Sequence, residues 1–226
     1  MLIAEIGLAH DGSLGNALAF IDAVADAGAD AVKFQCHDGD TNTDPPQSGI
    51  DLTQDSDRAA YWDRTAFTPH HWELLSDRAK ERGIIFGCSP FSMKAMKLIE
   101  DLVFFVKLSR NHDRRGHLLN YCKNNCRKWS SGSPWKWRGV PYLIGSGKVL
   151  SHFGINTYDP RHNLGISDHS GTIWPCLRAA ALGAEIFEVH VCWDRRAFGP
   201  DAQYSLTIDE LATLAEGIKA IKHGNN

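Results

Sequence analysis

The chain has 226 residues and a formal net charge of −3, and 43% of its residues are hydrophobic and 23% charged. This is the composition of a globular protein rather than a disordered one. No apolar stretch approaches the roughly 20 residues of a membrane span, and no basic region of a signal peptide opens the chain. We therefore expect a cytoplasmic protein with no membrane partner, and the mild acidity argues against nucleic acid as a main partner.

The six cysteines show no Cys-x-x-Cys spacing. In a reducing compartment such scattered cysteines are free thiols rather than a disulfide or zinc framework. The length allows one large domain. An eight-unit α/β barrel typically needs about 250 residues, so the chain is slightly short for a complete one.

Short β-rich runs alternate with amphipathic segments along most of the chain. The predicted strands are residues 2–9, 31–35, 84–89, 103–108, 164–167 and 185–191. The predicted helices run from Leu14 to a stop at Gly28, from Pro69 to Gly83, from Ser92 to Leu102, from Ile173 to Leu182, and onward from a capping box formed by Thr207 and Glu210. Repeated strand–helix units predict a parallel sheet wrapped by helices.

Two segments interrupt this alternation. Residues 37–66 are polar and rich in Pro and Asp, which predicts a long functional loop. Residues 109–163 show no clear period after about Asn125. Between Leu102 and Tyr158 there are ten Lys or Arg residues and only one acid, and three tryptophans are clustered. Such a stretch can bind single-stranded nucleic acid by stacking and charge, but we favour an irregular insert.

Charged and metal-binding residue types lie on the predicted strands. Lys33 and Gln35 alternate and therefore point to the same face, and Glu5 lies inside the first strand. Charges inside a sheet are costly unless they are paired or functional. A simple pairing of Lys33 with Glu5 is the structural alternative, just as His169 and His190 can be ordinary hydrogen-bonded histidines at strand ends.

The order of several motifs resembles the sialic acid synthase (NeuB) family over roughly residues 1–109 and 164–222. The motifs are Ala4-Glu5-Ile6-Gly7 with His10-x-Gly12, Gly28 to Lys33-Phe34-Gln35, Ser89-Pro90-Phe91, Lys107, Gly165-Ile166-Ser167-Asp168-His169-Ser170-Gly171, Glu188-x-His190, and Gly199-Pro200-Asp201 with Ser205-Leu206. The resemblance implies an α/β TIM-type (β/α)8 barrel, incomplete or distorted around its fifth and sixth units. It implies one barrel domain over residues 1–226 without the family's C-terminal antifreeze-like domain.

The family condenses phosphoenolpyruvate with N-acetylmannosamine, or a related N-acetylated aminosugar, to a nine-carbon 2-keto acid and phosphate. By resemblance, His169 and His190 hold a divalent metal, manganese or alternatively magnesium or cobalt, and Lys33, Lys107 and Ser167 hold phosphoenolpyruvate. Lysines suit a ligand with a carboxylate and a phosphate. Two imidazoles leave open positions on a metal that can polarise an aldehyde.

The remaining assignments concern the sugar and the attacking water. By resemblance, Gln35 binds substrate, and Glu5 and Asp201 act with Lys107 as catalytic residues, because a carboxylate can position or deprotonate water. Ser130 stands in a sequence similar to the family's phosphate-side loop. Glu188 faces the same side as His190, so we expect it to orient the metal site. A homodimer is a family expectation.

The chain departs from the family pattern in its middle. Ala9 replaces a usual Asn, and Arg110 and His112 stand where the family has Ser and Glu. The sequence Pro134 to Arg138 is what a Met-Glu-Met-Glu coding stretch yields out of frame, so a reading-frame disruption is one hypothesis. A catalytically impaired barrel that binds metal or sugar phosphate, and a KDO-8-phosphate or DAHP type of synthase, remain as alternatives.

Overall fold

The computed structural model describes residues 1–37, 55, 58–109, 117–125, 127–128, 141–145 and 165–224. Its centre is a parallel sheet with the strand order β5-β6-β4-β3-β2-β1-β8-β7, and β9 pairs with β8. The strands are β1 (Leu2–Gly7), β2 (Ala31–Cys36), β3 (Ile85–Pro90), β4 (Phe105–Ser109), β5 (Arg127–Lys128), β6 (Pro141–Gly145), β7 (Gly165–Asp168), β8 (Ile186–Cys192) and β9 (Leu206–Thr207).

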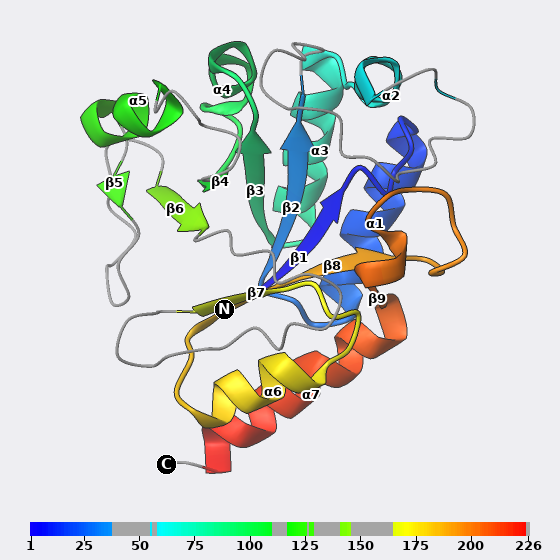
Figure 1. Cartoon of the computed structure of the whole chain (residues 1–226), viewed down its shortest axis with the longest axis vertical. Helices are drawn as coiled ribbons and strands as arrows, with labels where there is room; N and C mark the ends of the chain where they lie inside the picture. Colours follow the sequence, from blue (N-terminus) through cyan, green and yellow to red (C-terminus); the bar gives the residue numbers. More distant parts are fainter. Residues whose placement is uncertain are drawn as a thin grey trace.

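Helices follow most strands and cover the outer face of the curled sheet (Figure 1). They are α1 (Leu14–Asp26), α2 (Arg58–Thr65), α3 (Pro69–Glu81), α4 (Met93–Ile99), α5 (His117–Asn125), α6 (Trp174–Ala181), α7 (Ile208–Gly224) and the short 3-10 helix η2 (Ala202–Tyr204). Neighbouring helices touch in the order α3, α1, α7, α6. This arrangement is the predicted α/β barrel architecture.

The helix boundaries confirm the predicted local signals. The Ser13 hydroxyl accepts a hydrogen bond from the Asn16 amide at the start of α1, which satisfies one of the free amides of the first turn. At the start of α7, the Glu210 carboxylate accepts from the Thr207 amide at 2.8 Å, the reciprocal half of a capping box. Gly28 follows α1 with φ +81°, a conformation that favours glycine.

Alternation along the strands separates two kinds of packing. Side chains such as Phe34 point outward and form the main core with Phe20 of α1 and Trp72 of α3. The inward side chains begin with an apolar layer of Ile3, Ala31 and Phe105, which are fully buried. Above this layer the inward positions become polar. The apolar layer closes one end of the barrel interior and leaves the carboxyl ends of the strands to form the site.

The predicted loop at residues 37–66 is partly wrong, because α2 forms within it. Tyr61 and Trp62 of this helix are buried in a small cluster with Leu8. Arg64 anchors the helix by ion pairs with Asp11 at 2.8 Å and Asp55 at 2.9 Å. Asp11 and Leu8 are distant from α2 in sequence, so the polar composition of the segment conceals the helix.

The prediction of an irregular segment at 109–163 also needs correction. Its described parts form α5, β5 and β6, and β6 continues the sheet by pairing with β4, with Lys107 opposite Leu143. No pairing among the described residues joins β7 to β5 or β6. The sheet is therefore a curled, open barrel, as expected for an incomplete one.

Two further expectations are covered by the described residues. Five cysteines there are free and buried, as predicted. No described helix combines the length and the apolar character that crossing a membrane requires.

We predict that Gly165→Ala destabilises the protein. A Cβ atom at Gly165 would lie 2.1 Å from the carbonyl oxygen of Ile186 on the paired strand. That oxygen cannot retreat without disturbing the β7–β8 ladder, so we expect the free energy of unfolding in urea to fall by about 1–3 kcal/mol.

Gly15→Ala in α1 is the matched control, because the nearest atom to its added Cβ lies 4.0 Å away. It should leave stability unchanged or raise it, since alanine is the better helix former. Equal unfolding midpoints for Gly165→Ala and the unmodified chain would contradict the close packing of β7 on β8.

Candidate active site

The site begins with a row of polar side chains above the apolar layer. Strand register places Glu5 of β1 opposite Lys33 of β2 on one side and opposite His190 of β8 on the other. In the same way, Ser167 of β7 lies opposite Glu188 of β8. Neighbouring parallel strands therefore bring these side chains into one interior, with Glu188 two residues before His190 on β8.

Lys33 and Glu5 form an ion pair that is almost completely withdrawn from water. Their side chains are 2% and 1% exposed. The Lys33 ammonium also donates to the Ser89 hydroxyl at 2.7 Å. Burial lowers the pKa of Lys33 to about 8, although the charge of Glu188 acts in the opposite direction. The structure thus contains the pairing that the sequence offered as an alternative, which leaves a functional role open.

A second, partly buried ion pair joins opposite parts of the curled sheet. The Lys107 ammonium of β4 forms an ion pair with Glu188 and donates to the Ser167 hydroxyl at 3.1 Å. The same hydroxyl donates to Glu188 at 3.1 Å. Burial alone would raise the pKa of Glu188, but the charges of Lys107 and Lys33 outweigh it and lower that pKa. Glu188 therefore pairs with lysine, and its role in orienting a metal site stays a prediction.

Two imidazoles lie above these pairs. The rings of His169, just after β7, and His190 have centroids 5.1 Å apart. Burial lowers the pKa of His190 to about 4 and also lowers that of His169. Both rings are then neutral near pH 7, which is the form that binds a metal. The Asp201 carboxylate lies 4.0 Å from Nδ1 of His190.

The donor set for a metal is accordingly small. No group of three His, Cys, Asp or Glu side chains with metal-binding geometry occurs among the described residues. Two neutral imidazoles with a carboxylate nearby fit a metal that keeps open positions for water or substrate oxygens. They do not fit a closed structural site with four protein ligands.

A third group of predicted residues meets at Gly7, where β1 ends. A Cβ atom at Gly7 would lie 3.3 Å from the Gln35 amide nitrogen, 3.5 Å from a Glu5 oxygen and 3.6 Å from an Asp201 oxygen. These three side chains surround one small space, which a larger residue at Gly7 would fill. The space lies at the carboxyl ends of β1 and β2, where a substrate is expected in a barrel.

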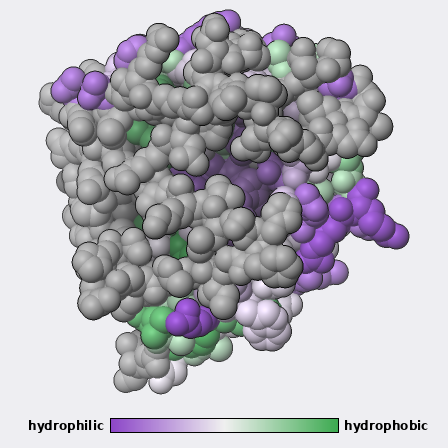
Figure 2. All heavy atoms as spheres, viewed as in Figure 1, coloured by the Kyte–Doolittle hydropathy of each residue, from purple (hydrophilic) through white to green (hydrophobic). Residues whose placement is uncertain are grey.

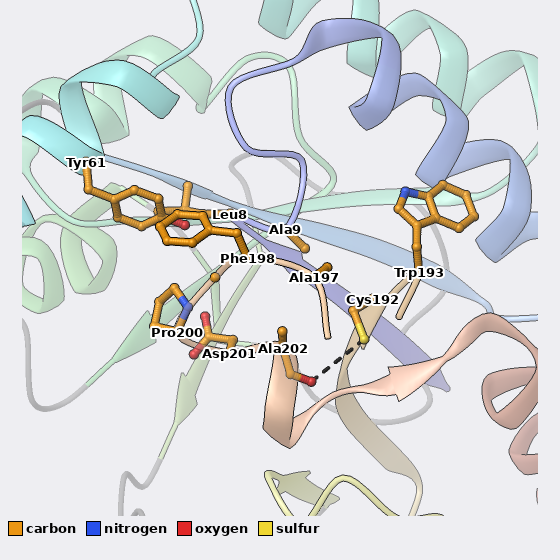
Figure 3. A pocket seen from close by; sticks show the side chains of 11 residues that line it. Leu8, Ala9, Tyr61, Cys192, Trp193, Ala197, Phe198, Pro200, Asp201 and Ala202 are labelled. Atoms are coloured by element: carbon orange, nitrogen blue, oxygen red, sulfur yellow. Dashed lines mark hydrogen bonds between the residues drawn. The ribbon is translucent and has the colours of Figure 1, made fainter. Parts of the chain in front are cut away.

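Polar and apolar groups adjoin near the site. Figure 2 shows hydrophilic described residues near the centre of the face seen in Figure 1. Beside Asp201 lies a small apolar cavity of about 20 Å³. Figure 3 shows Tyr61, Phe198 and Pro200 on the Asp201 side of this cavity. Polar groups that can bind a sugar thus adjoin an apolar wall.

An arginine that the sequence analysis did not single out holds the loops of the site. Arg195 donates to the carbonyl oxygens of Gly171 at 2.8 Å and Ser205 at 3.0 Å, and it forms an ion pair with Glu210. It therefore ties the loop after His169 to the segment after Asp201. No spacing in the sequence indicates these carbonyl partners.

The structure brings most of the predicted site residues into one interior. These residues are Glu5, Lys33, Gln35, Lys107, Ser167, His169, His190 and Asp201. Ser130 lies outside the described residues. Ser89 belongs to the Ser89-Pro90-Phe91 motif, which predicts no specific role for it. In the structure, its hydroxyl accepts a hydrogen bond from Lys33.

Comparison with known proteins gives consistent matches over most of the chain. A model of the NeuB family matches residues 20–129 and 154–225. The chain is 30% identical to the spore coat polysaccharide biosynthesis protein SpsE of Bacillus subtilis over 259 positions, which cover 96% of the chain and 66% of SpsE. It is 26% identical to a pseudaminic acid synthase of Campylobacter jejuni, over 96% of the chain and 72% of that protein.

A solved structure supports the same relationship. The N-acetylneuraminic acid synthetase of Leptospira borgpetersenii superposes with a TM-score of 0.74 at 25% identity, covering 100% of this chain and 84% of that one. The 259 aligned positions with SpsE exceed the 226 residues of the chain, so SpsE contains residues that this chain lacks. Residues 130–153, which the family model leaves unmatched, fall in the basic, tryptophan-rich segment.

We predict that Lys33→Met strongly destabilises the fold. The substitution leaves the Glu5 carboxylate, 1% exposed, without its cation. Loss of one partner of a buried pair costs about 3–5 kcal/mol, so urea unfolding should show a reduction of that order.

The double variant Lys33→Met/Glu5→Gln removes both charges and should regain most of the lost stability. Lys80→Met is the matched control, because the Lys80 side chain is 70% exposed, and its effect should stay within about 0.5 kcal/mol. A Lys33→Met variant as stable as this control would show that the buried pair is not formed.

Proposed function

Because the chain belongs to the NeuB family, whose members similar to it include sugar acid synthases, we propose that it joins phosphoenolpyruvate to an N-acetylated aminosugar. The products would be a nine-carbon 2-keto sugar acid and phosphate, and N-acetylmannosamine is the first sugar to test. The observation that carries the proposal is the pairing of two interior lysines with carboxylates close to two neutral imidazoles.

Phosphoenolpyruvate suits the two lysines. Its carboxylate and phosphate oxygens accept charge-assisted hydrogen bonds, and Lys33 and Lys107 present ammonium groups inside the barrel. The Ser167 hydroxyl, which already touches Lys107, adds a neutral donor. Each lysine carries a carboxylate partner, so the two pairs are together neutral before substrate arrives. Phosphoenolpyruvate would then make the site negative overall, so a further cation close by would stabilise its binding.

His169 and His190 are the residues that would hold that cation. When bound, a divalent metal, most simply manganese, supplies positive charge and polarises the aldehyde oxygen of the sugar. The burial that keeps both imidazoles neutral also keeps their lone pairs available. Asp201 lies within reach of the same region and can accept a hydrogen bond from a sugar hydroxyl.

The Glu5 carboxylate is suited to accept a hydrogen bond or a proton from water. Apart from its ion pair with Lys33, neither carboxylate oxygen of Glu5 accepts a hydrogen bond among the described residues. In the reaction, C3 of phosphoenolpyruvate attacks the aldehyde carbon of the sugar, the aldehyde oxygen takes up a proton, and C2 becomes electrophilic. A buried carboxylate with unused lone pairs is an acceptor for the water that then adds to C2 and gives up a proton. Phosphate then leaves by cleavage of the C–O bond. Lys33 would hold the departing negative charge.

A second candidate follows from the incomplete sheet. The chain spans 66% of the length of SpsE, and the family model leaves residues 130–153 unmatched. These facts favour, as the alternative, a catalytically impaired barrel that binds metal or sugar phosphate without turnover. A synthase acting on a phosphorylated aldose, of the KDO-8-phosphate or DAHP type, is the other alternative.

Phosphate release is the decisive measurement. With phosphoenolpyruvate, manganese and N-acetylmannosamine, we expect one phosphate for each 2-keto acid formed. Lys107→Met should lose most of this activity, because it removes a cation from the substrate site. Parallel reactions contain a 2,4-diacetamido-2,4,6-trideoxyhexose or a phosphorylated aldose. Turnover with only the phosphorylated aldose would replace the aminosugar proposal, and a folded protein without turnover on any sugar would refute the enzymatic one.

Metal binding is a separate prediction. His169→Ala should abolish manganese binding in calorimetry, because one of two imidazole ligands is lost. His70→Ala is the matched control, since the His70 side chain on α3 is 73% exposed, and it should bind manganese like the unmodified chain. Unchanged affinity in His169→Ala would show that His169 is not a ligand.

A further inference from the structure

His37 forms a contact that points to a role in the sugar site. Lys33, Gln35 and His37 alternate along β2 and its end, so their side chains follow one another up the inner face of the barrel. Nε2 of His37 lies 3.0 Å from Oε1 of Gln35. We propose that His37 is a positioning residue, which fixes the end of the Gln35 amide that faces the substrate. This inference rests on the proposed function of Gln35 as a sugar-binding residue.

The surroundings of the amide decide its orientation. The end of the Gln35 amide that faces away from His37 is Nε2. It lies near Gly7, where oxygens of the Glu5 and Asp201 carboxylates also lie. Carboxylates accept hydrogen bonds only, so they favour the amide nitrogen on their side. The amide oxygen then faces His37 and requires a donor. His37 must therefore carry its proton on Nε2, and the NH2 group of Gln35 is directed toward the space proposed for the sugar.

The ring of His37 is held on both faces. It stacks on Phe91 with centroids 4.0 Å apart at 16°, and on Trp62 with centroids 4.6 Å apart at 12°. Phe91 is fixed beside β2, because its amide donates to the Cys36 carbonyl at 3.1 Å. Trp62 belongs to α2, which Arg64 anchors. The two stacked aromatic rings restrict the imidazole, so its Nε2–H has one direction in which to donate.

A simpler role for His37 would be that of a space-filling aromatic ring between Trp62 and Phe91. Phenylalanine would satisfy that role equally well, because it keeps the stacked arrangement. It cannot donate to Gln35, however, and would leave the amide free to rotate. A sugar oxygen that needs the NH2 group would then meet either end of the amide. The effect of the substitution His37→Phe therefore distinguishes the two roles.

The test is His37→Phe in the full chain, compared with Gln35→Leu and with both changes together. We expect His37→Phe to raise the KM for the aminosugar roughly 5- to 20-fold, the effect of one lost hydrogen bond. The KM for phosphoenolpyruvate should stay within about twofold of the value for the unmodified chain. The urea midpoint should equal that of the unmodified chain within error. The double variant should match Gln35→Leu, because His37 acts through that residue.

Three kinetic results would overturn the proposal. These are an unchanged sugar KM in His37→Phe, an equal rise in the KM for phosphoenolpyruvate, and independent, multiplying effects in the double variant. His37→Gln, which keeps a donor near the same position, should recover part of the sugar affinity. A purely space-filling role would make His37→Gln worse than His37→Phe.

A second measurement keeps the proposal testable if no sugar is turned over. Nitrogen-15 NMR of the imidazoles should show His37 as the Nε2–H tautomer, and Gln35→Leu should shift its Nε2 resonance. The exposed His70 is the matched control and should not change. An Nδ1–H tautomer, or a His37 signal that ignores Gln35→Leu, would overturn the positioning role. The expected spectra without turnover would uphold that role and refute only the enzymatic function.

Discussion

The placement of two lysines inside a parallel sheet, one of them fully buried, is the constraint on which the rest of the structure depends. An unpaired ammonium in this interior would be very costly, so each lysine requires a carboxylate at a defined position. Lys33 finds Glu5 on the neighbouring strand, which links β2 to β1 at one register. Lys107 finds Glu188 and Ser167 across the interior. This second contact spans the interior from β4 to β7 and β8, which the described strand pairings connect only through β3, β2 and β1.

The interior is layered as a consequence. Ile3, Ala31 and Phe105 close one end, the ion pairs form the middle, and His169 and His190 lie toward the open end. The apolar layer excludes water from below, which strengthens the electrostatic interactions above it. The described residues leave the carboxyl ends of the strands as the polar end of this interior. At that end, the ammonium groups of Lys33 and Lys107, which pairing with carboxylates stabilises, could also bind an anionic ligand.

The distribution of the site along the chain explains how it persists beside an irregular segment. The candidate residues come from β1, β2 and β4 near the N-terminus and from β7 and β8 near the C-terminus, and the pairing of β1 with β8 brings these two parts together. The family model leaves residues 130–153 unmatched. None of the described contacts among the candidate residues requires them.

The sequence by itself determined the strand–helix alternation, the helix ends and the identity of most candidate residues. Those features depend on neighbours within a few positions or on motifs read as short strings, such as Ser13 at a helix start. Only the tertiary structure decided the features that depend on distant partners. It placed α2 within the polar segment through Arg64 and Asp11, paired Glu188 with Lys107 across the interior, and set His37 between Trp62 and Phe91. Local sequence patterns do not determine these contacts, because each contact depends on the relative energies of interactions between residues far apart in the chain.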